Sequence, residues 1–229
     1  MAGHSHWAQI KYKKASNDKK RSQLISKLVN LILTAGRDNP DPINNPKLKA
    51  AIERAKEFGV SQEVIERNLK KLKEKNINQL EEFILEAYGP GGVGILIKCL
   101  SDNRNRTIGE IKNILQKNKA KLAEPGSVIW LFKEVGVIVI NKSDFNEDII
   151  DRNYNLIDDF KEDDDKIIFY LPINNLYNFK YILEDMNIKV LSTEIKFINK
   201  NYVNIENKEE VNNLVEKLLD HNDVYEVYY

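Results

Sequence analysis

A dense group of positive side chains lies within residues 1–21 of the chain. Six Lys and Arg residues fall within eleven positions, and the stretch "MAGHSHW" places two His and one Trp just before them. Ammonium and guanidinium groups neutralise phosphates and planar rings stack on bases, so this combination is typical of a segment that binds nucleic acid. The alternative is an ordinary solvated start to a helix. The expected nucleic-acid contacts in this segment are His4, Ser5, His6, Trp7, Lys11, Lys13, Lys14, Lys19, Lys20 and Arg21.

A second pair of cations lies at the start of a helix that we expect over residues 104–118. Asp102 or Asn103 can cap this helix, which places Arg104 and Arg106 in or beside its first turn. Positive charges there oppose the helix dipole by roughly 0.3–1 kcal/mol each, and a phosphate bound at the helix start would remove that conflict. Both arginines are therefore candidate phosphate contacts. The alternative is that they pair with carboxylates of the acidic part of the chain.

The other chemically capable residues do not make a catalytic or metal-binding set. The glycines of "YGPGG" run into an apolar strand and lack the Lys and Ser/Thr of a phosphate-binding loop, so they indicate a tight turn. Cys99 is expected to be buried in that strand, and His221 has no nucleophile near it in the sequence. We expect the acidic run "DDFKEDDDK" to be a solvated loop. The sequence thus predicts no enzyme activity, cofactor, metal site or small-molecule substrate.

Composition and charge limit the class of protein. The 229 residues are 42% hydrophobic and 31% charged, as in globular proteins, and the single cysteine fits a reducing compartment. No apolar run approaches the roughly 18 residues that span a bilayer, so we expect a cytoplasmic protein without membrane contact. The net charge of zero hides a polarity: residues 1–75 carry +9 and residues 76–229 carry −9. This asymmetry favours a basic module that binds a polyanion, although the two halves could instead attract each other.

The elements that must position these residues follow from hydrophobic spacing. Apolar residues at helical intervals predict three helices that form a bundle. The first ends at Gly36, the second begins at Asn45 and Pro46, and the third begins at Ser61. Strands are expected at "FILEAYG", "VGILIKCL" and "SVIWLF", around the helix at 104–118. From Gly136 the order β-α-β-β-α-β indicates a ferredoxin-like unit, and a last helix capped by Asn207 precedes the strand "VYEVYY".

These elements predict an α+β protein of three domains. Residues 1–77 form the basic helical bundle with an extended N-terminal arm, and residues 78–133 with 203–229 form a middle α/β domain. Residues 134–202 form an inserted ferredoxin-like α+β domain with the acidic loop.

The motifs "MAGHSHW", "YGPGG", "LSDNRNRT", "GSVIWLF" and "DHNDVYEVYY" resemble the YebC/PmpR family over essentially the whole chain. This family includes bacterial YebC-type regulators and the mitochondrial translational activator of cytochrome oxidase. The resemblance implies three domains, with the third inserted into the second, and no catalytic residues or cofactor.

The resemblance also implies one of two functions, because members are described as DNA-binding transcriptional regulators or as ribosome-associated factors that help translation through difficult sequences. A long cationic arm suits a crevice in the large-subunit ribosomal RNA better than B-DNA, because no helix here is both strongly basic and shaped as a recognition helix. We therefore expect a translation factor, with a double-stranded DNA-binding regulator as the alternative. The sequence leaves the oligomeric state and the responding genes or messages open.

Overall fold

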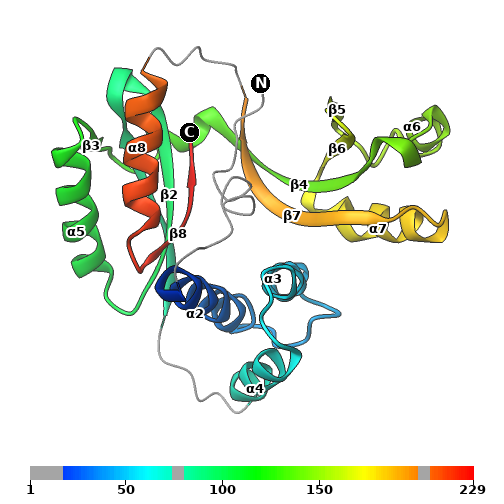
Figure 1. Ribbon diagram of the computed structural model, residues 1–229, viewed down its shortest axis with the longest axis horizontal. Coiled ribbons are helices and arrows are strands. Elements are labelled where there is room, and N and C mark those ends of the chain that lie inside the picture. Colours follow the sequence, from blue (N-terminus) through cyan, green and yellow to red (C-terminus); the bar gives the residue numbers. More distant parts are fainter. Residues whose placement is uncertain (1–17, 74–79, 201–206) are drawn as a thin grey trace.

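The computed structural model describes residues 18–73, 80–200 and 207–229. Figure 1 shows three groups of elements: a bundle of helices, a sheet with helices beside it, and a second sheet with helices of its own. Both sheets are antiparallel, so the chain has the mixed α and β character that the sequence predicts. None of the helices in this described part is long and apolar enough to cross a membrane.

The bundle forms as the helix signals predict. Its helices are α2 (Asp18–Ala35), α3 (Pro46–Glu57) and α4 (Gln62–Lys73). The Asn45 side chain caps α3 by accepting the Leu48 N–H at 3.0 Å, and Pro46 occupies the first helical position. The core of the bundle consists of Leu28, Ile32, Leu48, Ala51, Ala55, Val60, Ile65 and Leu72.

The first sheet has the strand order β3-β1-β2-β8. Its strands are β1 (Glu81–Tyr88), β2 (Gly94–Ser101), β3 (Lys121–Leu122) and β8 (Val224–Tyr228). Helices α5 (Arg104–Lys117) and α8 (Lys208–Leu219) pack their apolar sides on one face (Figure 1). Strand β8 pairs with β2, so the last strand of the chain lies in the same sheet as β1 and β2.

The second sheet has the strand order β5-β6-β4-β7. Its elements are β4 (Phe132–Asn141), α6 (Glu147–Asn153), β5 (Asp159–Asp163), β6 (Lys166–Leu171), α7 (Leu176–Asp185) and β7 (Val190–Asn199). This is the predicted β-α-β-β-α-β order. Phe132 begins β4 and Phe197 lies near the end of β7, and there they pack with Leu96 and Tyr228 on the other face of the first sheet.

Three local predictions are wrong. Most of "SVIWLF" is a loop and a 3-10 turn (Ile129–Leu131), because loop hydrogen bonds to a buried carboxylate bend the chain away from the sheet. The acidic run contains strand β5, since backbone pairing to β6 at a sheet edge leaves its charged side chains in solvent. Asn207 stands at the start of α8, but its side chain makes no capping bond.

Candidate nucleic-acid interface

The predicted arm falls almost entirely outside the described residues. His4, Ser5, His6, Trp7, Lys11, Lys13 and Lys14 precede Asp18, where the description begins. Lys19 and Lys20 lie in the first turn of α2, and Arg21 follows them with an exposed side chain. The arm therefore continues directly into the first helix of the bundle, and its contacts stay a prediction.

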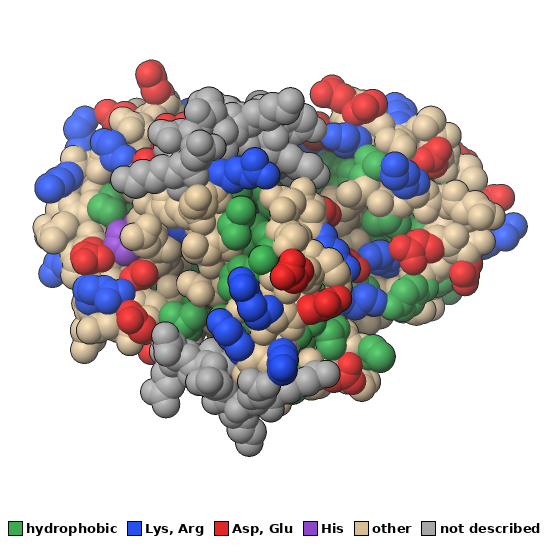
Figure 2. Space-filling model, turned by 60° about the horizontal axis from the view of Figure 1, so that its bottom comes forward, with side chains coloured by type: hydrophobic (Ala, Val, Ile, Leu, Met, Phe, Trp, Pro, Cys, Tyr) green, Lys and Arg blue, Asp and Glu red, His purple; other side chains and the backbone are tan. Residues whose placement is uncertain are grey.

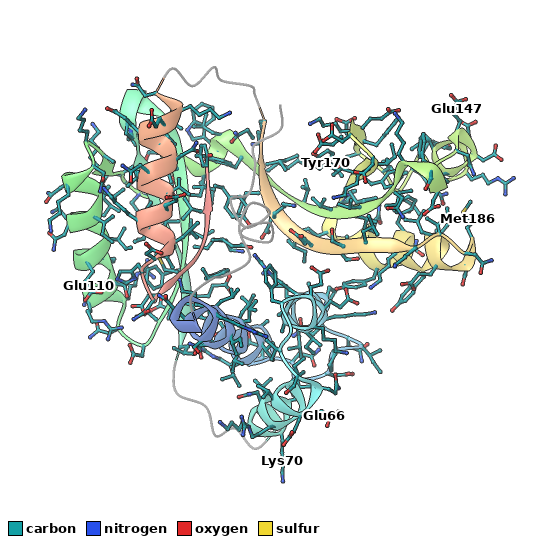
Figure 3. The ribbon with its side chains drawn as sticks, viewed as in Figure 1. Glu66, Lys70, Glu110, Glu147, Tyr170 and Met186 are labelled. Atoms are coloured by element: carbon teal, nitrogen blue, oxygen red, sulfur yellow. The ribbon has the colours of Figure 1, made fainter. Side chains whose placement is uncertain are left out.

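The bundle carries a positive surface of its own. Residues 18–73 hold thirteen Lys and Arg against seven Asp and Glu, a net charge of +6. The exposed cations among them are Arg21, Arg37, Lys47, Lys56, Arg67, Lys70 and Lys71. Figure 2 shows Lys and Arg side chains gathered where the bundle comes forward, and in Figure 3 Lys70 points away from the rest of the molecule. This surface extends the positive charge of the arm over folded structure.

The opposite side of the bundle docks on the first sheet through a buried ion pair. Arg54 of α3 donates to Glu226 of β8, and these side chains are only 12% and 4% exposed. Lys98 lies 3.3 Å from the same carboxylate, and the Tyr228 hydroxyl donates to it at 2.6 Å. Burial acts to raise the pKa of Glu226, but the charges of Arg54 and Lys98 outweigh it and hold the pKa at about 2. Glu226 is therefore an ionised group that ties two parts of the chain together.

A cavity of about 470 Å³ lies beside this ion pair, where the bundle meets both sheets. Its lining includes Arg54 and Leu31 from the bundle, Lys98 from the first sheet and Glu134 and Thr193 from the second. The bundle thus approaches the second sheet as well as the first.

Polar contacts hold the bundle to helices of both sheets. Lys180 of α7 lies 2.7 Å from Glu53 of α3, and the Lys49 ammonium lies 4.3 Å from the centre of the Tyr177 ring. On the other side, the Lys27 ammonium donates to the Leu219 carbonyl at the end of α8, at 2.7 Å. The bundle is thereby fixed with its docking face inward and its positive surface outward.

Lys27 gives this docking a measurable pH dependence. Burial lowers the pKa of Lys27 to about 8, against the opposing attraction of Asp220 and Asp223. In the unfolded chain the Lys27 ammonium keeps its proton up to its ordinary pKa of 10.5, whereas in the folded chain it loses the proton above about 8. The free energy of unfolding must therefore rise with pH between about 8 and 10.5. We expect the free energy of unfolding of the wild type, relative to that of Lys27→Met, to increase by about 3 kcal/mol over this interval. Denaturant unfolding of both proteins at a series of pH values measures this increase. A difference between wild type and Lys27→Met that stays constant with pH would contradict the prediction.

The arginines at the start of α5 lie in the predicted first turn and are ion-paired. Asn103 caps the helix by accepting the Arg106 N–H at 3.1 Å. Arg104 pairs with Glu81 at 2.6 Å, and Arg106 pairs with Asp102 at 2.9 Å. These contacts correspond to the alternative stated for both arginines. Their side chains remain 48% and 44% exposed, so phosphate binding by these residues is still a prediction.

Asp223 holds the side chain of Arg106 in place. Its carboxylate accepts hydrogen bonds from Arg106 at 3.0 Å, from the Thr107 hydroxyl at 2.6 Å and from the Ser101 hydroxyl at 3.0 Å. Partial burial acts to raise the pKa of Asp223, but these hydrogen bonds lower it below its ordinary value. The carboxylate thus holds Arg106 against the end of the first sheet.

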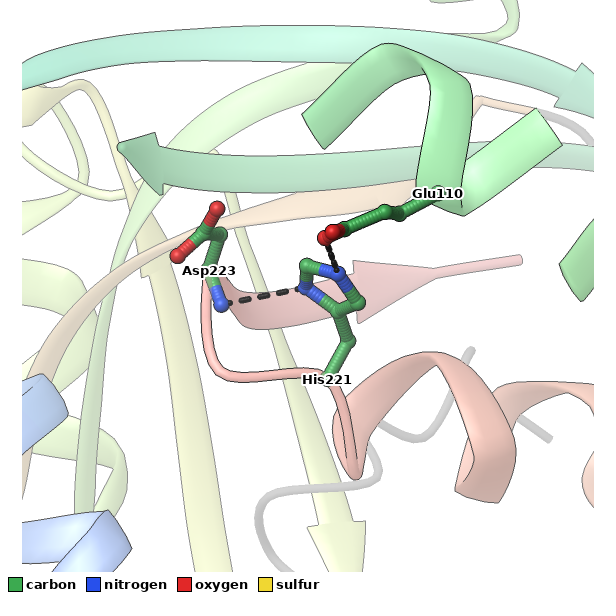
Figure 4. Close-up of side chains that lie close together, drawn as sticks. All are labelled: Glu110, His221 and Asp223. Carbon is green, nitrogen blue, oxygen red and sulfur yellow. Dashed lines mark hydrogen bonds and ion pairs between the residues drawn. The ribbon is translucent and has the colours of Figure 1, made fainter. Parts of the chain in front are cut away.

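His221 positions the turn that carries Asp223 (Figure 4). Its Nε2 lies 2.7 Å from a Glu110 carboxylate oxygen, and its Nδ1 accepts the Asp223 N–H at 3.1 Å. We assign the proton to Nε2, because Nδ1 already acts as an acceptor. Both ring nitrogens are therefore used in shaping a turn, and the hydroxyls of Ser101 and Thr107 contact Asp223 rather than the imidazole. The arrangement is structural rather than nucleophilic.

Two further residues behave as the sequence predicts. Cys99 is fully buried in β2, and burial raises the pKa of its thiol to about 12, so it is an inert apolar side chain. "YGPGG" forms the short turn between β1 and β2, where Gly91 adopts a φ of +72° that favours glycine.

The sequence reasoning missed the Glu226 cluster and a second buried carboxylate, Glu86. Glu86 lies in β1 and accepts three backbone N–H groups from the loop at residues 126–129. The available signal was a charged residue within each strand pattern, "LEAY" and "VYEVYY". A charged residue in a strand can be identified as buried only when its partners are known. The sequence does not show the partner of Glu226, because Arg54 is 172 positions away from it.

Comparisons with known proteins agree over the whole chain. The family model described as "TACO1/YebC protein N-terminal domain" matches residues 5–75, and "TACO1/YebC second and third domain" matches residues 80–229. A "probable transcriptional regulatory protein" of Halothermothrix orenii is 40% identical, with 100% of this chain and 94% of that protein aligned. A relative with the same description from Caldanaerobacter subterraneus is 39% identical over 100% and 97% of the two chains. The crystal structure of a conserved hypothetical protein from Aquifex aeolicus has a TM-score of 0.80 at 34% identity, covering 97% and 95%.

Proposed function

Because this chain belongs to the TACO1/YebC family, we propose that it is a non-enzymatic, cytoplasmic regulator of gene expression that acts by binding nucleic acid. The observation that carries this proposal is the outward positive surface of the bundle, joined to the cationic arm. Phosphate backbones are the abundant cellular partners of such a surface. The description of the relatives as probable transcriptional regulatory proteins supports the same class of partner.

We propose further that the nucleic acid is the ribosomal RNA of the large subunit and that the protein assists translation. Helix α3 packs against α2 and docks on β7 and β8, so it does not project like a recognition helix. Helix α4 carries Glu63 and Glu66 in the turns before its exposed cations, which lowers the net positive charge that this helix offers to a groove. A basic arm that leads into a basic bundle suits an RNA crevice better. Double-stranded DNA is the second candidate, favoured by the description of the relatives.

We propose that the chain has three domains, with the boundaries 1–77, 78–133 plus 203–229, and 134–202. This division supports the assignment of nucleic-acid binding to the N-terminal domain. Support comes from three clusters of buried residues, each drawn from one of these segments. The arm and bundle then form the RNA-binding domain, with Arg104 and Arg106 of the middle domain as further phosphate contacts.

Sedimentation of a cell extract through a gradient tests this function. The proposal expects the protein to migrate with the large ribosomal subunit and to be released by high salt, because the contacts are electrostatic. Release by nuclease digestion of the RNA is also expected. A protein that stays at the top of the gradient but shifts one promoter fragment sequence-specifically would establish the DNA alternative instead.

A further inference from the structure

Trp130 is an exposed aromatic side chain in a loop that the structure holds in a defined shape. The indole is 60% exposed although it is the largest apolar side chain in its segment. Its Nε1–H donates to the Ser127 carbonyl at 2.9 Å, so the polar end is satisfied inside the loop and the ring is left to solvent. Trp130 therefore offers a fixed planar surface rather than a freely moving side chain.

The loop under Trp130 is organised by Glu86. This residue is 7% exposed, and its carboxylate accepts the N–H groups of Gly126 and Val128 at 2.6 Å and of Ile129 at 2.8 Å. No Lys or Arg of the described residues pairs with it, so backbone donors alone compensate the buried charge. A buried carboxylate used in this way fixes the backbone directly before Trp130.

Two lysines lie next to this loop in the fold. Lys121 lies 5.7 Å from the centre of the Tyr88 ring, whose hydroxyl donates to the same Ser127 carbonyl that holds the indole. The backbone N–H of Lys200 donates to the carbonyl of Leu131, the residue after Trp130, at 2.9 Å. Both lysines are exposed, and neither forms an ion pair with another described residue. Two exposed lysines thus adjoin the loop that carries the indole, one through Tyr88 and one through the backbone of Leu131.

From this arrangement we propose that Trp130 is a stacking platform for an unpaired nucleobase, with Lys121 and Lys200 as contacts to the adjoining phosphates. The proposal rests on the proposed function and specifies that the bound nucleic acid is single-stranded at this point. A paired base in a duplex has its faces covered by its neighbours, whereas an unpaired base can stack on an aromatic ring. Exposed lysines on the residues that adjoin the loop favour a base within a sugar-phosphate chain over an apolar protein surface.

The test uses the full-length protein and a fluorescently labelled single-stranded RNA of about twelve uridines, with binding followed by anisotropy. Trp130→Ala is expected to weaken binding about tenfold, because one stacked base loses its aromatic partner. Trp130→Phe is expected to retain most of the affinity. Tyr154→Ala is the matched control, since Tyr154 is an aromatic residue that is 76% exposed elsewhere on the surface. An oligonucleotide of the same length without bases is expected to bind equally to wild type and Trp130→Ala.

The salt dependence of binding separates stacking from charge. Trp130→Ala is expected to leave the slope of log K against log salt unchanged, whereas Lys121→Ala combined with Lys200→Ala is expected to reduce it by about 1.4. Wild-type affinity in Trp130→Ala, with binding still lost on charge reversal of the arm, would overturn the platform and leave the proposed function standing. If the wild type binds neither single-stranded RNA nor ribosomes, both proposals are overturned. Normal RNA binding with weakened ribosome association in Trp130→Ala would instead assign the side chain to a protein contact.

Discussion

Replacing Glu226 by glutamine is expected to destabilise the folded protein by about 3–5 kcal/mol, because it removes the charge that compensates the buried Arg54 guanidinium and the Lys98 ammonium. The amide has nearly the same shape, so the loss reports on electrostatics rather than on a cavity. Denaturant unfolding measures the change. The matched control is Glu210→Gln, whose partner Lys119 is 79% exposed, and we expect a loss of at most about 1 kcal/mol there.

A second change distinguishes an unpaired charge from general damage at this site. Arg54→Met combined with Glu226→Gln is expected to recover part of the stability lost in the single Glu226→Gln variant, since the buried cation is removed together with its partner. Equal destabilisation of the single and double variants would contradict this account. So would a loss in Glu226→Gln no greater than that of Glu210→Gln.

Glu226 also makes the free energy of unfolding depend on pH in the acid range. The pKa of Glu226 is about 2 in the folded chain against an ordinary value of 4.5. Its contribution is therefore fully present above pH 4.5 and is lost as the pH falls towards about 2. The difference of 2.5 units corresponds to about 3 kcal/mol, in agreement with the expected mutational loss. The stability advantage of the wild type over Glu226→Gln should shrink across this interval, because glutamine does not titrate.

Changing Lys11, Lys13 and Lys14 together to glutamate is expected to weaken nucleic-acid binding by on the order of 100-fold at 0.15 M salt. Three phosphate contacts are lost and three repulsive charges are introduced. The salt slope of binding should fall by about 2–3 for the same reason. Lysine side chains are mostly solvated surface groups, so we expect the unfolding midpoint to stay unchanged. Anisotropy with labelled RNA measures the binding of free RNA, and sedimentation with ribosomes measures ribosome association.

The matched control carries the same change in net charge on the acidic part of the chain. Lys112, Lys189 and Lys208 are exposed lysines outside the bundle, and their joint replacement by glutamate should reduce binding only through weak long-range repulsion. Equal losses in the two triple variants would mean that net charge, rather than the arm, determines binding. Unchanged ribosome association in the arm variant would refute the role of the arm.

Local sequence signals were sufficient for most elements of the fold. Asn45 and Pro46 start a helix because the cap bond and the fixed φ of proline depend only on immediate neighbours. Regular apolar spacing likewise identified α5 and α8, and the element order of the second sheet. The signals failed at β5, where pairing with β6 overrides the weak strand preference of an acidic run. They failed again at residues 127–131, where Glu86 determines the shape of the loop.

The sequence by itself determined where positive charge is concentrated, since residue type and position along the chain are enough to establish that 1–75 carry a net charge of +9. Only the tertiary structure decided which charges are used internally and which face solvent. Arg54 is buried against Glu226, whereas Lys47 and Lys56 of the same helix are exposed. Lys47 and Arg54 are seven residues apart and therefore share one face of the helix, so local sequence does not separate them. The difference arises from a strand more than 160 residues further along the chain. Local propensity acts over a few residues, but the free energy of a charge depends on every group that folding brings near it.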